Sequence, residues 1–496
     1  MLSQTLYRLG RLAARRPWAV IASWLVLAAL VVGASSAFGA KLEDSFRVPG
    51  LDSQRANDLL EAAGSGQAGI TAQVVATPAG DGTFADDPTA QAAREGLEAD
   101  VRNLPHVLGT TDELSPDGRV ALIRVQYPAL DELSSADLDR LTSIETGPAI
   151  RTEMGGDLFF AFESSPTNAG EIVGILAALA ILLLAFGSFV AATLPIGMAV
   201  LGLAVGTGAM PLLAHVMVVP SYAPVLGAMV GLGVGIDYAL FVVTRHREYL
   251  ARGTATHESV ARSIATAGRP VVFAGGIVVV SILGLAVAGV PFMTAGGIAI
   301  SIVVLVMVVA STTLLPALLA VAGRRVVGRR PVHATSPGWE RWTRHVTRHP
   351  RVYLAGATLV LVALAAPVVA LRVGIPDDGA LPPSRTERQA YDLVAQGFGP
   401  GRNGPLVVVV EGGAEALERV ATAAAADPGV AGIEAPVAQG RIGTLVVYPT
   451  TGPQERATYD TVERLRTHVF PAALAGTTAR AHVGGQAANF ADVGVR

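Results

Sequence analysis

The sequence contains no cysteine, which excludes disulfides, thiol nucleophiles and cysteine-ligated zinc. Charged residues are also scarce: they make up 16% of the 496 residues, against about 25% in soluble globular proteins. A net charge of −3 excludes a global basic field that would attract nucleic acid. Apolar residues are abundant instead, at 51% of the chain, with a mean hydropathy of +0.48. This balance predicts a membrane protein.

Seven apolar runs are candidates to cross a bilayer core of about 30 Å, which takes about 20 helical residues. They are Trp18–Phe38, Ile172–Phe186, Phe189–Val219, Tyr222–Val243, Val271–Val290, Thr294–Val321 and Val352–Leu371. Only a tight FGSF break separates the second run from the third. The amphipathic stretch Thr254–Gly268 is typical of a connector helix on the membrane surface.

Arginine sets the expected orientation, because Arg and Lys favour the cytoplasmic side of a membrane. Three arginine clusters fall on the same side if the seven spans alternate: Arg8, Arg11, Arg15 and Arg16; Arg245, Arg247 and Arg252; and Arg324, Arg325, Arg329, Arg330, Arg341, Arg344, Arg348 and Arg351. We therefore expect the N-terminus inside the cell, and Lys41–Gly170 and Gly374–Arg496 outside. The alternative for the first run is a signal peptide cleaved near Ala37–Gly39, although the run is longer than usual for one.

The two outer segments are predicted to be small α/β domains. In the first, strands at 72–77 and 119–127 flank a helix at 87–104, and in the second, strands at 404–410 and 441–449 flank a helix at 414–426. Strand–helix–strand alternation is typical of α/β folds. The predicted organisation is 1–39 for the first span with its basic N-terminus, 40–170 for the first outer domain, 171–322 for spans two to six, 323–351 for a cytoplasmic linker, 352–373 for the seventh span and 374–496 for an incomplete second outer domain.

A long internal repeat relates the two parts of the chain. RLGRLAARRP (8–17) matches RWTRHVTRHP (341–350), GRVALIRVQYP (118–128) matches GRIGTLVVYP (440–449), and GGDLFFAF (155–162) matches GGQAANFA (484–491). In the first copy membrane spans follow the last motif, whereas the second copy stops at Arg496. We expect a truncated chain; the alternative is a natural half-length product that pairs with another chain.

Asp237 is the only formally charged residue in the runs 172–243 and 271–323. A carboxylate in hydrocarbon costs at least about 2.5–3.5 kcal/mol on insertion scales, so a functional role is the default expectation. Burial favours the neutral form of a carboxylic acid, which makes this acid a candidate for reversible protonation near neutral pH. The hydroxyl of Tyr238 could complete a hydrogen-bonded proton relay. The alternatives are a structural acid for Asp237 and a packing role for Tyr238.

Glycines surround this acid at helical spacing. Gly227, Gly231 and Gly235 recur every four residues, and Gly233 lies one turn before Asp237. Small residues at this spacing let helices approach closely, so we expect the acid to face another helix and not lipid. The GLGVG segment is not a dinucleotide loop, because it lies inside an apolar helical run with no preceding strand. P-loop, HExxH and GxSxG motifs are absent as well, so we expect no cofactor, no metal and no enzymatic activity.

The stretch GLGVGIDYALFVVTRHREYLARG (231–253) resembles the signature of the MMPL family, the mycobacterial-type large membrane proteins of the RND superfamily. The likeness extends to FGSFVAATLP (186–195), ATAGRPVVFAG (265–275) and TTLLPALLA (312–320). The resemblance implies a polytopic α-helical membrane protein, with an RND-like helix bundle and α/β porter-like extracytoplasmic domains. It also implies a secondary active transporter in a bacterial inner membrane, which uses proton motive force to export lipids or lipid-like molecules.

The same resemblance implies roles for individual residues. Asp237 and Tyr238 would form half of the proton relay, matched by an Asp-Tyr pair in the second half, and Phe241 and Gly233 would line it. The second half of the membrane domain is missing from this sequence, which leaves open whether the chain alone couples protons. Two other classes stay open: a lipid sensor, because spans two to six resemble the sterol-sensing unit of Patched-like proteins, and a non-transporting scaffold.

The expected partners follow from these readings. They are membrane lipids, protons, a hydrophobic cargo and a missing C-terminal half or a partner subunit, with no nucleic acid. The sequence does not distinguish lipid, glycolipid, siderophore and drug as the cargo.

Overall fold

The computed structural model describes residues 2–40, 42, 50–63, 69–162, 168–327, 337–370, 377–440 and 442–494. The chain divides into two compact units, each built from two separate segments. The membrane unit comprises Met1–Arg47 and Pro166–Leu371, and the α/β unit comprises Val48–Ser165 and Arg372–Arg496. The two outer domains predicted at 40–170 and 374–496 therefore join in one unit.

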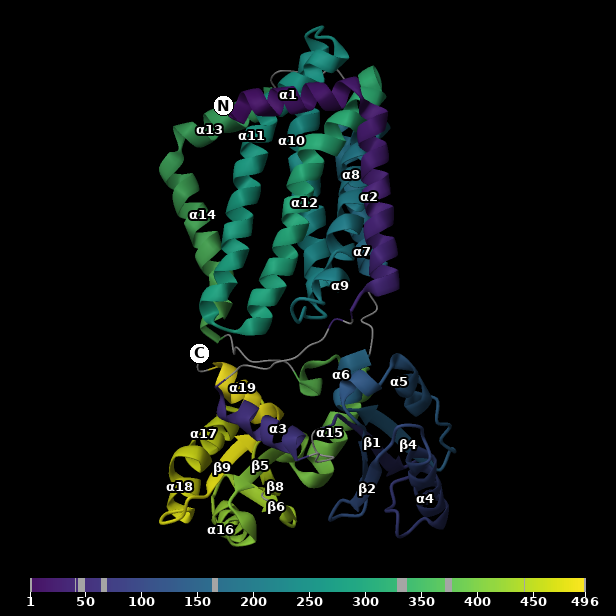
Figure 1. The fold of residues 1–496 in the computed structure, drawn as a ribbon, viewed down its shortest axis with the longest axis vertical. Helices are drawn as coiled ribbons and strands as arrows, with labels where there is room; N and C mark the ends of the chain where they lie inside the picture. The colour runs from purple at the N-terminus through teal and green to yellow at the C-terminus, as the bar shows by residue number, and fades with distance from the viewer. Residues whose placement is uncertain are drawn as a thin grey trace. The chain divides into compact units, whose positions relative to one another are not determined.

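The regular elements described in the membrane unit are helices (Figure 1). These are α1 (Leu2–Arg15), α2 (Pro17–Phe38), α7 (Asn168–Phe186), α8 (Phe189–Gly208), α9 (Met210–Leu213), α10 (Ala223–Ala251), α11 (Thr256–Leu283), α12 (Pro291–Ala322), α13 (Pro337–Arg348) and α14 (Pro350–Ala365). Within the described residues, six helical segments are long and apolar enough to cross a membrane, and α7 adds a shorter apolar segment, Val173–Phe186. Each of these seven segments overlaps one of the seven predicted runs.

Two boundaries differ from the prediction. The third span was expected to reach Val219, but its helices end at Leu213. The segment that follows is rich in valine and precedes Pro220, and both features favour extended backbone over helix. The connector expected at Thr254–Gly268 is continuous with the fifth span in α11, with Pro270 inside the helix. Membrane helices accommodate such prolines because neighbouring groups satisfy the freed backbone carbonyl.

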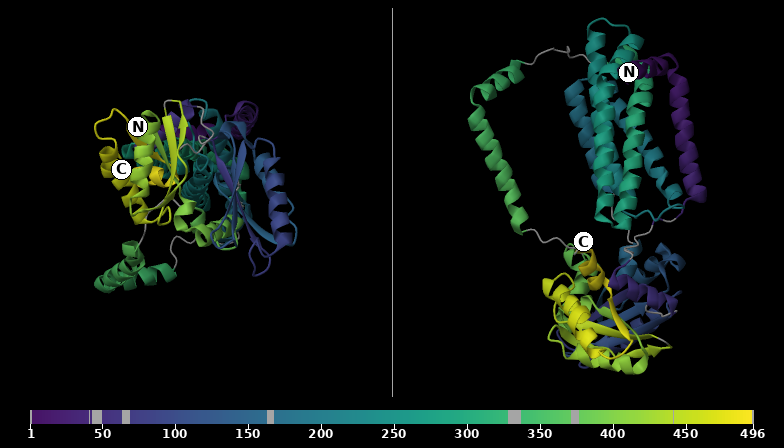
Figure 2. Two further views of the ribbon diagram at one scale, coloured as in Figure 1. Left: turned by 90° about the horizontal axis from the view of Figure 1, so that it is seen from below. Right: turned by 60° about the vertical axis from the view of Figure 1, so that its left-hand side comes forward.

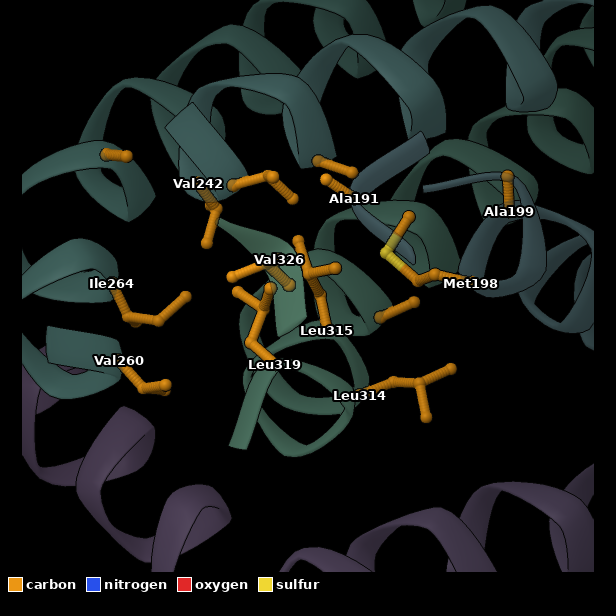
Figure 3. Close-up of a cluster of buried hydrophobic side chains, with 14 of the residues drawn as sticks. Ala191, Met198, Ala199, Val242, Val260, Ile264, Leu314, Leu315, Leu319 and Val326 are labelled. Carbon is orange, nitrogen blue, oxygen red and sulfur yellow. The ribbon is translucent and has the colours of Figure 1, made fainter. Parts of the chain in front are cut away.

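The core of the bundle lies where α8, α10, α11 and α12 meet (Figure 3). Its labelled side chains are Ala191, Met198 and Ala199 of α8, Val242 of α10, Val260 and Ile264 of α11, Leu314, Leu315 and Leu319 of α12, and Val326 just after α12. Trp24 of α2 joins this core and donates its indole N–H to the hydroxyl of Thr313 over 3.1 Å. These contacts make α12 the central helix of the bundle.

Glycines set the distance between α10 and its neighbours. A Cβ on Gly231 would lie 2.7 Å from Cγ1 of Val303, and one on Gly235 would lie 3.0 Å from Sδ of Met307. Gly227 makes a similarly close approach to α9. Because only a hydrogen atom fits at these positions, the three glycines place the backbone of α10 directly against α12 and α9.

The α/β unit contains two antiparallel sheets of the same topology (Figure 2). The first has the order β2-β3-β1-β4 and the second the order β6-β8-β5-β9, with β7 paired to β8. The strands are β1 (Thr71–Pro78), β2 (Gly109–Leu114), β3 (Ala121–Gln126), β4 (Ile150–Gly155), β5 (Leu406–Glu411), β6 (Val430–Ile433), β7 (Val437–Gln439), β8 (Ile442–Pro449) and β9 (Arg480–Gly484). This correspondence of strands confirms the internal repeat.

Helices accompany both sheets. They are α3 (Asp52–Ala62), α4 (Pro88–Arg102), α5 (Ser135–Thr142), α6 (Asp157–Phe162), α15 (Thr386–Phe398), α16 (Gly413–Ala425), α17 (Arg456–Arg464), α18 (Phe470–Ala473) and α19 (Gln486–Gly494). The strands and helices expected from sequence in both outer segments are confirmed, with shifts of a few residues at their ends. The start of α4 shows why: the carboxylate of Asp87 caps the helix by accepting a hydrogen bond from the backbone N–H of Thr89 over 2.9 Å, and Pro88 takes the first helical position.

The two halves of the α/β unit exchange one helix each. Helix α3 comes from the first outer segment but packs on β9 and β5 of the second sheet, whereas α15 comes from the second segment and packs on β4 and β1 of the first. Ala56 and Leu60 of α3 are buried with Val409. Ala390 and Val394 of α15 are buried with strands β1 and β3. The main core of each half comes from its own segment, whereas the other face of each sheet is covered by the helix from the other segment.

The repeated GG motif lets each exchanged helix approach the sheet closely. Gly155 ends β4 and Gly484 ends β9, each at the point where the exchanged helix crosses the sheet. A Cβ on Gly484 would lie 3.0 Å from the Cβ of Ala56, so a larger residue would push α3 away. The next residues, Gly156 and Gly485, have φ angles of 100° and 97°, a backbone region that favours glycine.

The exchanged helices are also anchored by matching hydrogen bonds at their first turns. The backbone N–H of Met154 in β4 donates to the hydroxyl of Thr386 in α15 over 2.8 Å. The backbone N–H of Val483 in β9 donates to the carboxylate of Asp52 in α3, also over 2.8 Å. The repeat thus preserves the position of the acceptor, although the residue that supplies it differs.

An acidic junction lies beside α15. One carboxylate oxygen of Asp378 lies 3.4 Å from the backbone nitrogen of Gly156, and the acids Glu387, Asp377 and Asp157 are near it. Burial, together with the negative charge of these three neighbours, raises the pKa of Asp378 to about 6. The junction therefore carries unfavourable charge when the folded protein is at neutral pH.

We predict that Gly231→Leu destabilises the membrane unit by about 1–3 kcal/mol, because the new side chain overlaps Val303. The measurement is the midpoint of thermal unfolding of the purified protein in detergent, followed by tryptophan fluorescence. Gly233→Leu is the matched control: a Cβ on Gly233 would meet no described atom within 4 Å, and the midpoint should not fall. Equal losses from the two substitutions would contradict the packing described here.

We predict that Asp378→Asn stabilises the α/β unit at pH 7.5 and has little effect at pH 4.5. The folded pKa lies above the ordinary value of 3.8, so ionisation costs the folded state free energy that accumulates as the pH rises from about 4 to about 6. The full shift corresponds to about 3 kcal/mol, which solvent screening of this partly exposed group reduces to about 1 kcal/mol. Hydrogen exchange of the β4 and α15 amides measures the effect.

The matched control for this pH dependence is Asp81→Asn, since Asp81 is an exposed loop residue of the same unit. It should leave exchange unchanged at both pH values. Stabilisation by Asp378→Asn that is as large at pH 4.5 as at pH 7.5 would show that charge is not the cause.

Candidate functional site

Helix α10 carries all the site residues predicted from the sequence, and its two faces differ. The face against α8, α11 and α12 is buried and includes Ala223, Gly227, Gly231, Gly235, Tyr238, Ala239, Val242 and Val243. The opposite face is exposed and carries Met229, Gly233, Asp237 and Phe241, one residue per turn. We call these four residues the exposed stripe of α10.

Asp237 lies at the centre of the exposed stripe. Its side chain is exposed, and within the described residues no hydrogen bond or ion pair to it is found. The glycine spacing led us to expect that the acid faces a neighbouring helix, whereas the structure places it on the other side of α10. The reason is helical geometry: two residues after Gly235 correspond to a rotation of about 200°, so the acid cannot share the glycine face.

Tyr238 lies on the buried face and not beside Asp237 on the stripe. Only 7% of its surface is exposed. Its ring lies at the contact with α11, where a Cβ on Gly275 would be 3.6 Å from the tyrosine hydroxyl. The two consecutive residues thus point in different directions: Asp237 lies on the exposed face, and the tyrosine hydroxyl lies against α11.

Phe241 and Gly233 lie on the exposed stripe, one turn on either side of Asp237. Phe241 is 60% exposed, and Gly233 has open space where a side chain would be. The structure therefore brings together Gly233, Asp237 and Phe241, and separates Tyr238 and the packing glycines from them. The stripe thus combines the carboxylate of Asp237, the bare backbone at Gly233 and two large apolar side chains. These are Phe241 and Met229, and Met229 is 66% exposed.

The end of α10 that follows the stripe holds two residues whose burial the sequence analysis missed. The guanidinium of Arg247 donates a 2.7 Å hydrogen bond to the backbone carbonyl of Phe186 at the end of α7, and it stacks 5.1 Å from the ring of the same residue. His246 is fully buried, with Nδ1 2.8 Å from the hydroxyl of Ser259 in α11. These contacts fasten this end of α10 to two neighbouring elements.

A signal for these two residues was present in the sequence. His246 and Arg247 continue the buried face of α10, because they follow Val242 and Val243 by one turn. We interpreted Arg247 only as a determinant of orientation, since arginine after an apolar run usually has that role. Helical spacing measured from the glycines would have indicated its burial.

Comparison with known proteins places these features in a family. The sequence model of the MMPL family matches residues 45–353. The membrane protein YdfJ of Bacillus subtilis is 32% identical over 493 residues, which cover 94% of this chain and 67% of YdfJ. MmpL11 of Mycolicibacterium smegmatis, named as an exporter of mycolic acid-containing lipids, is 27% identical over 98% of this chain and 54% of its own length. MmpL3 of Mycobacterium tuberculosis, named as a trehalose monomycolate exporter, is 28% identical over 49% of this chain and 29% of its own.

These matches include the helix with the exposed stripe, because α10 lies inside the region that the family model covers. This chain spans about half to two thirds of the length of YdfJ and MmpL11. Together with the apolar helices described above, the matches identify a multi-pass membrane protein. The chain belongs to the MMPL family.

Proposed function

We propose that this chain is part of an exporter of lipids or lipid-like molecules that is driven by the proton motive force across a bacterial inner membrane. The observation that carries the proposal is the carboxylate of Asp237 on the exposed stripe of α10. Left against lipid, it would cost at least about 2.5–3.5 kcal/mol. A protein surface that covers the stripe removes this cost and gives the acid a partner for proton exchange.

The partner surface is proposed to be a second helical bundle, supplied by a C-terminal half or by a partner subunit. Gly233 lets a facing helix approach closely, while Met229 and Phe241 keep lipid and bulk water away from the acid. Within this contact Asp237 gains and loses a proton. Each proton that moves down a potential of 100 mV supplies about 2.3 kcal/mol.

Tyr238 is proposed as the second member of this half of the relay. Its hydroxyl lies at the contact of α10 with α11, on the buried side of the helix. A proton path that includes both residues therefore requires α10 to rotate or α11 to shift. The cytoplasmic position of the N-terminus, proposed from the arginine clusters, would bring the fixed end of α10 at Arg247 to the inner side of the membrane.

The names of two relatives support a lipid-like cargo. MmpL11 of Mycolicibacterium smegmatis is named as an exporter of mycolic acid-containing lipids, and MmpL3 of Mycobacterium tuberculosis is named as an exporter of trehalose monomycolate. The α/β unit, built from the two segments expected outside the cell, is proposed to guide the cargo. A hydrophobic cargo also suits a membrane unit with wide apolar exposed surfaces on α11 and α14.

We predict that Asp237→Asn abolishes proton-coupled transport without unfolding the protein, because an amide cannot exchange a proton at neutral pH. The assay uses proteoliposomes that contain the protein with its partner half, an imposed pH gradient and a fluorescent phosphatidylethanolamine as the probe. Movement of the probe between leaflets is followed by dithionite quenching. The gradient-dependent part should fall to the level of protein-free vesicles.

The matched control is Glu248→Gln, which removes another carboxylate of α10, one that pairs with Arg245 over 2.8 Å. It should retain gradient-dependent transport. Normal transport by the Asp237→Asn protein would refute the proton-relay role. Gradient-independent binding of the probe without movement would favour the lipid-sensor class, and no interaction with the probe would favour a scaffold.

A further inference from the structure

Two amphipathic helices lead into membrane helices through the same sharp backbone bend, which we call the elbow. Helix α1 precedes α2, and α13 precedes α14 at the matching position of the repeat. The elbow residue Arg16 has φ −127° and ψ 56°, and its counterpart His349 has φ −126° and ψ 50°. A proline follows each elbow residue at the first position of the membrane helix. The backbone is therefore repeated even though the side chains differ.

Helix α1 is covered by protein. Its residues Leu6, Gly10 and Ala14 are buried, and its main neighbour is α11. The contact is close: a Cβ on Gly10 would lie 3.0 Å from the Cβ of Ile264. The hydroxyl of Tyr7 adds a 2.9 Å hydrogen bond to Glu258 at the start of α11. Small residues are thus required where α1 meets its partner helix.

Helix α13 lacks these small residues. The repeat places Trp339 at the position of Leu6, Thr343 at that of Gly10 and Thr347 at that of Ala14. Thr343 would bring a branched side chain to a site where even a Cβ is tight. The described side chains of α13 are not buried, and Trp339 and Trp342 are 71% and 52% exposed. A close helix contact of the α1 kind is therefore incompatible with this sequence.

The exposed residues of α13 form two opposite faces. Trp339, Trp342 and Val346 lie within about 60° of one another around the helix, and Arg344 and Arg348 lie on the other side. Glu340 pairs with Arg344 over 2.9 Å. No carboxylate in the described part of the chain pairs with Arg348. A tryptophan face opposite an arginine-rich face is typical of helices that lie in the plane of a membrane surface.

The elbow holds α13 in an orientation that suits such a surface. The ring of Trp342 meets that of Tyr353 in α14 edge to face, with 5.5 Å between their centroids. His345 contacts the same tyrosine ring at 5.8 Å. Figure 1 shows α13 bent away from the axis of α14. If α14 spans the membrane, this bend turns α13 towards the membrane plane.

We propose that α13 is a membrane-surface docking helix that binds the headgroups of anionic phospholipids. Trp339, Trp342 and Val346 enter the boundary between headgroups and acyl chains, where tryptophan is enriched. Arg344 and Arg348 reach the phosphates along their extended side chains. The anionic surface of the cytoplasmic leaflet is the complementary partner. Only the choice of leaflet rests on the orientation proposed above.

The test uses the full chain in nanodiscs of phosphatidylcholine, with and without phosphatidylglycerol. In a Trp18→Phe/Trp24→Phe background, Trp339 and Trp342 are the only tryptophans left. Quenching of their emission by lipids brominated on the acyl chain reports insertion of α13. We expect quenching that grows several-fold with phosphatidylglycerol and is reversed by salt, because salt screens the attraction between arginine and phosphate.

Two double variants distinguish lipid binding by α13 from a general effect of positive charge on the protein. Arg344→Gln/Arg348→Gln should abolish the dependence on phosphatidylglycerol. Arg8→Gln/Arg11→Gln removes the same charge from exposed positions of α1 and should leave the dependence intact. Asp237→Asn should also leave it intact, so failure of this proposal and failure of the proposed transport are distinguishable.

Quenching that is equal in the two lipid mixtures, or absent from both, would overturn the proposal. The first result means that apolar insertion occurs without headgroup recognition, and the second means that protein or water surrounds α13. If the Trp18→Phe/Trp24→Phe protein folds poorly, hydrogen exchange of the α13 amides in the unsubstituted protein replaces the fluorescence measurement. Protection should then rise with phosphatidylglycerol, and protection independent of it would refute the inference.

Discussion

The close contact of α10 with α12 is the constraint on which the site depends. Gly231 and Gly235 allow Val303 and Met307 to reach the backbone of α10, and this contact fixes the rotation of the helix about its axis. Once the rotation is fixed, Asp237 has to lie on the free face of the bundle. The carboxylate of Asp237 is therefore available to a partner, because the packing glycines occupy the opposite side of α10. The same contact fixes the position of this carboxylate on the apolar surface.

Much of the fold could be predicted from the sequence because the signals are local. Apolar runs define membrane helices by length, and Asp87 with Pro88 marks the start of α4. The rotation of α10 also follows from the sequence, because the helical period places Asp237 about 200° around the helix from Gly235 and hence on a different face from the packing glycines. The exchange of α3 and α15 could not be predicted, because the apolar stripe of a short helix such as Ala56 and Leu60 fits either of two similar sheets.

The internal repeat shows which features are kept in both copies and which differ between them. Both copies keep the glycine pair at the end of the last strand and a polar acceptor at the start of the exchanged helix, because the exchanged helix crosses the sheet closely at this point. Both copies also keep the elbow before a membrane helix. The helix ahead of the elbow is free to change, and it presents small residues to protein in α1 but tryptophans and arginines in α13.

The helix exchange also constrains the order in which the protein is made. The first sheet is complete once β4 has left the ribosome, yet its cover, α15, follows only after α7 to α14 have been synthesised. At about 5–20 residues per second, this delay is of the order of tens of seconds. During that time Val75 and Leu122 lack Ala390 and Val394, the side chains that bury them in the finished protein. Correct folding of the α/β unit is thus tied to the speed of membrane insertion, and a pause in translation prolongs the exposure of an aggregation-prone surface.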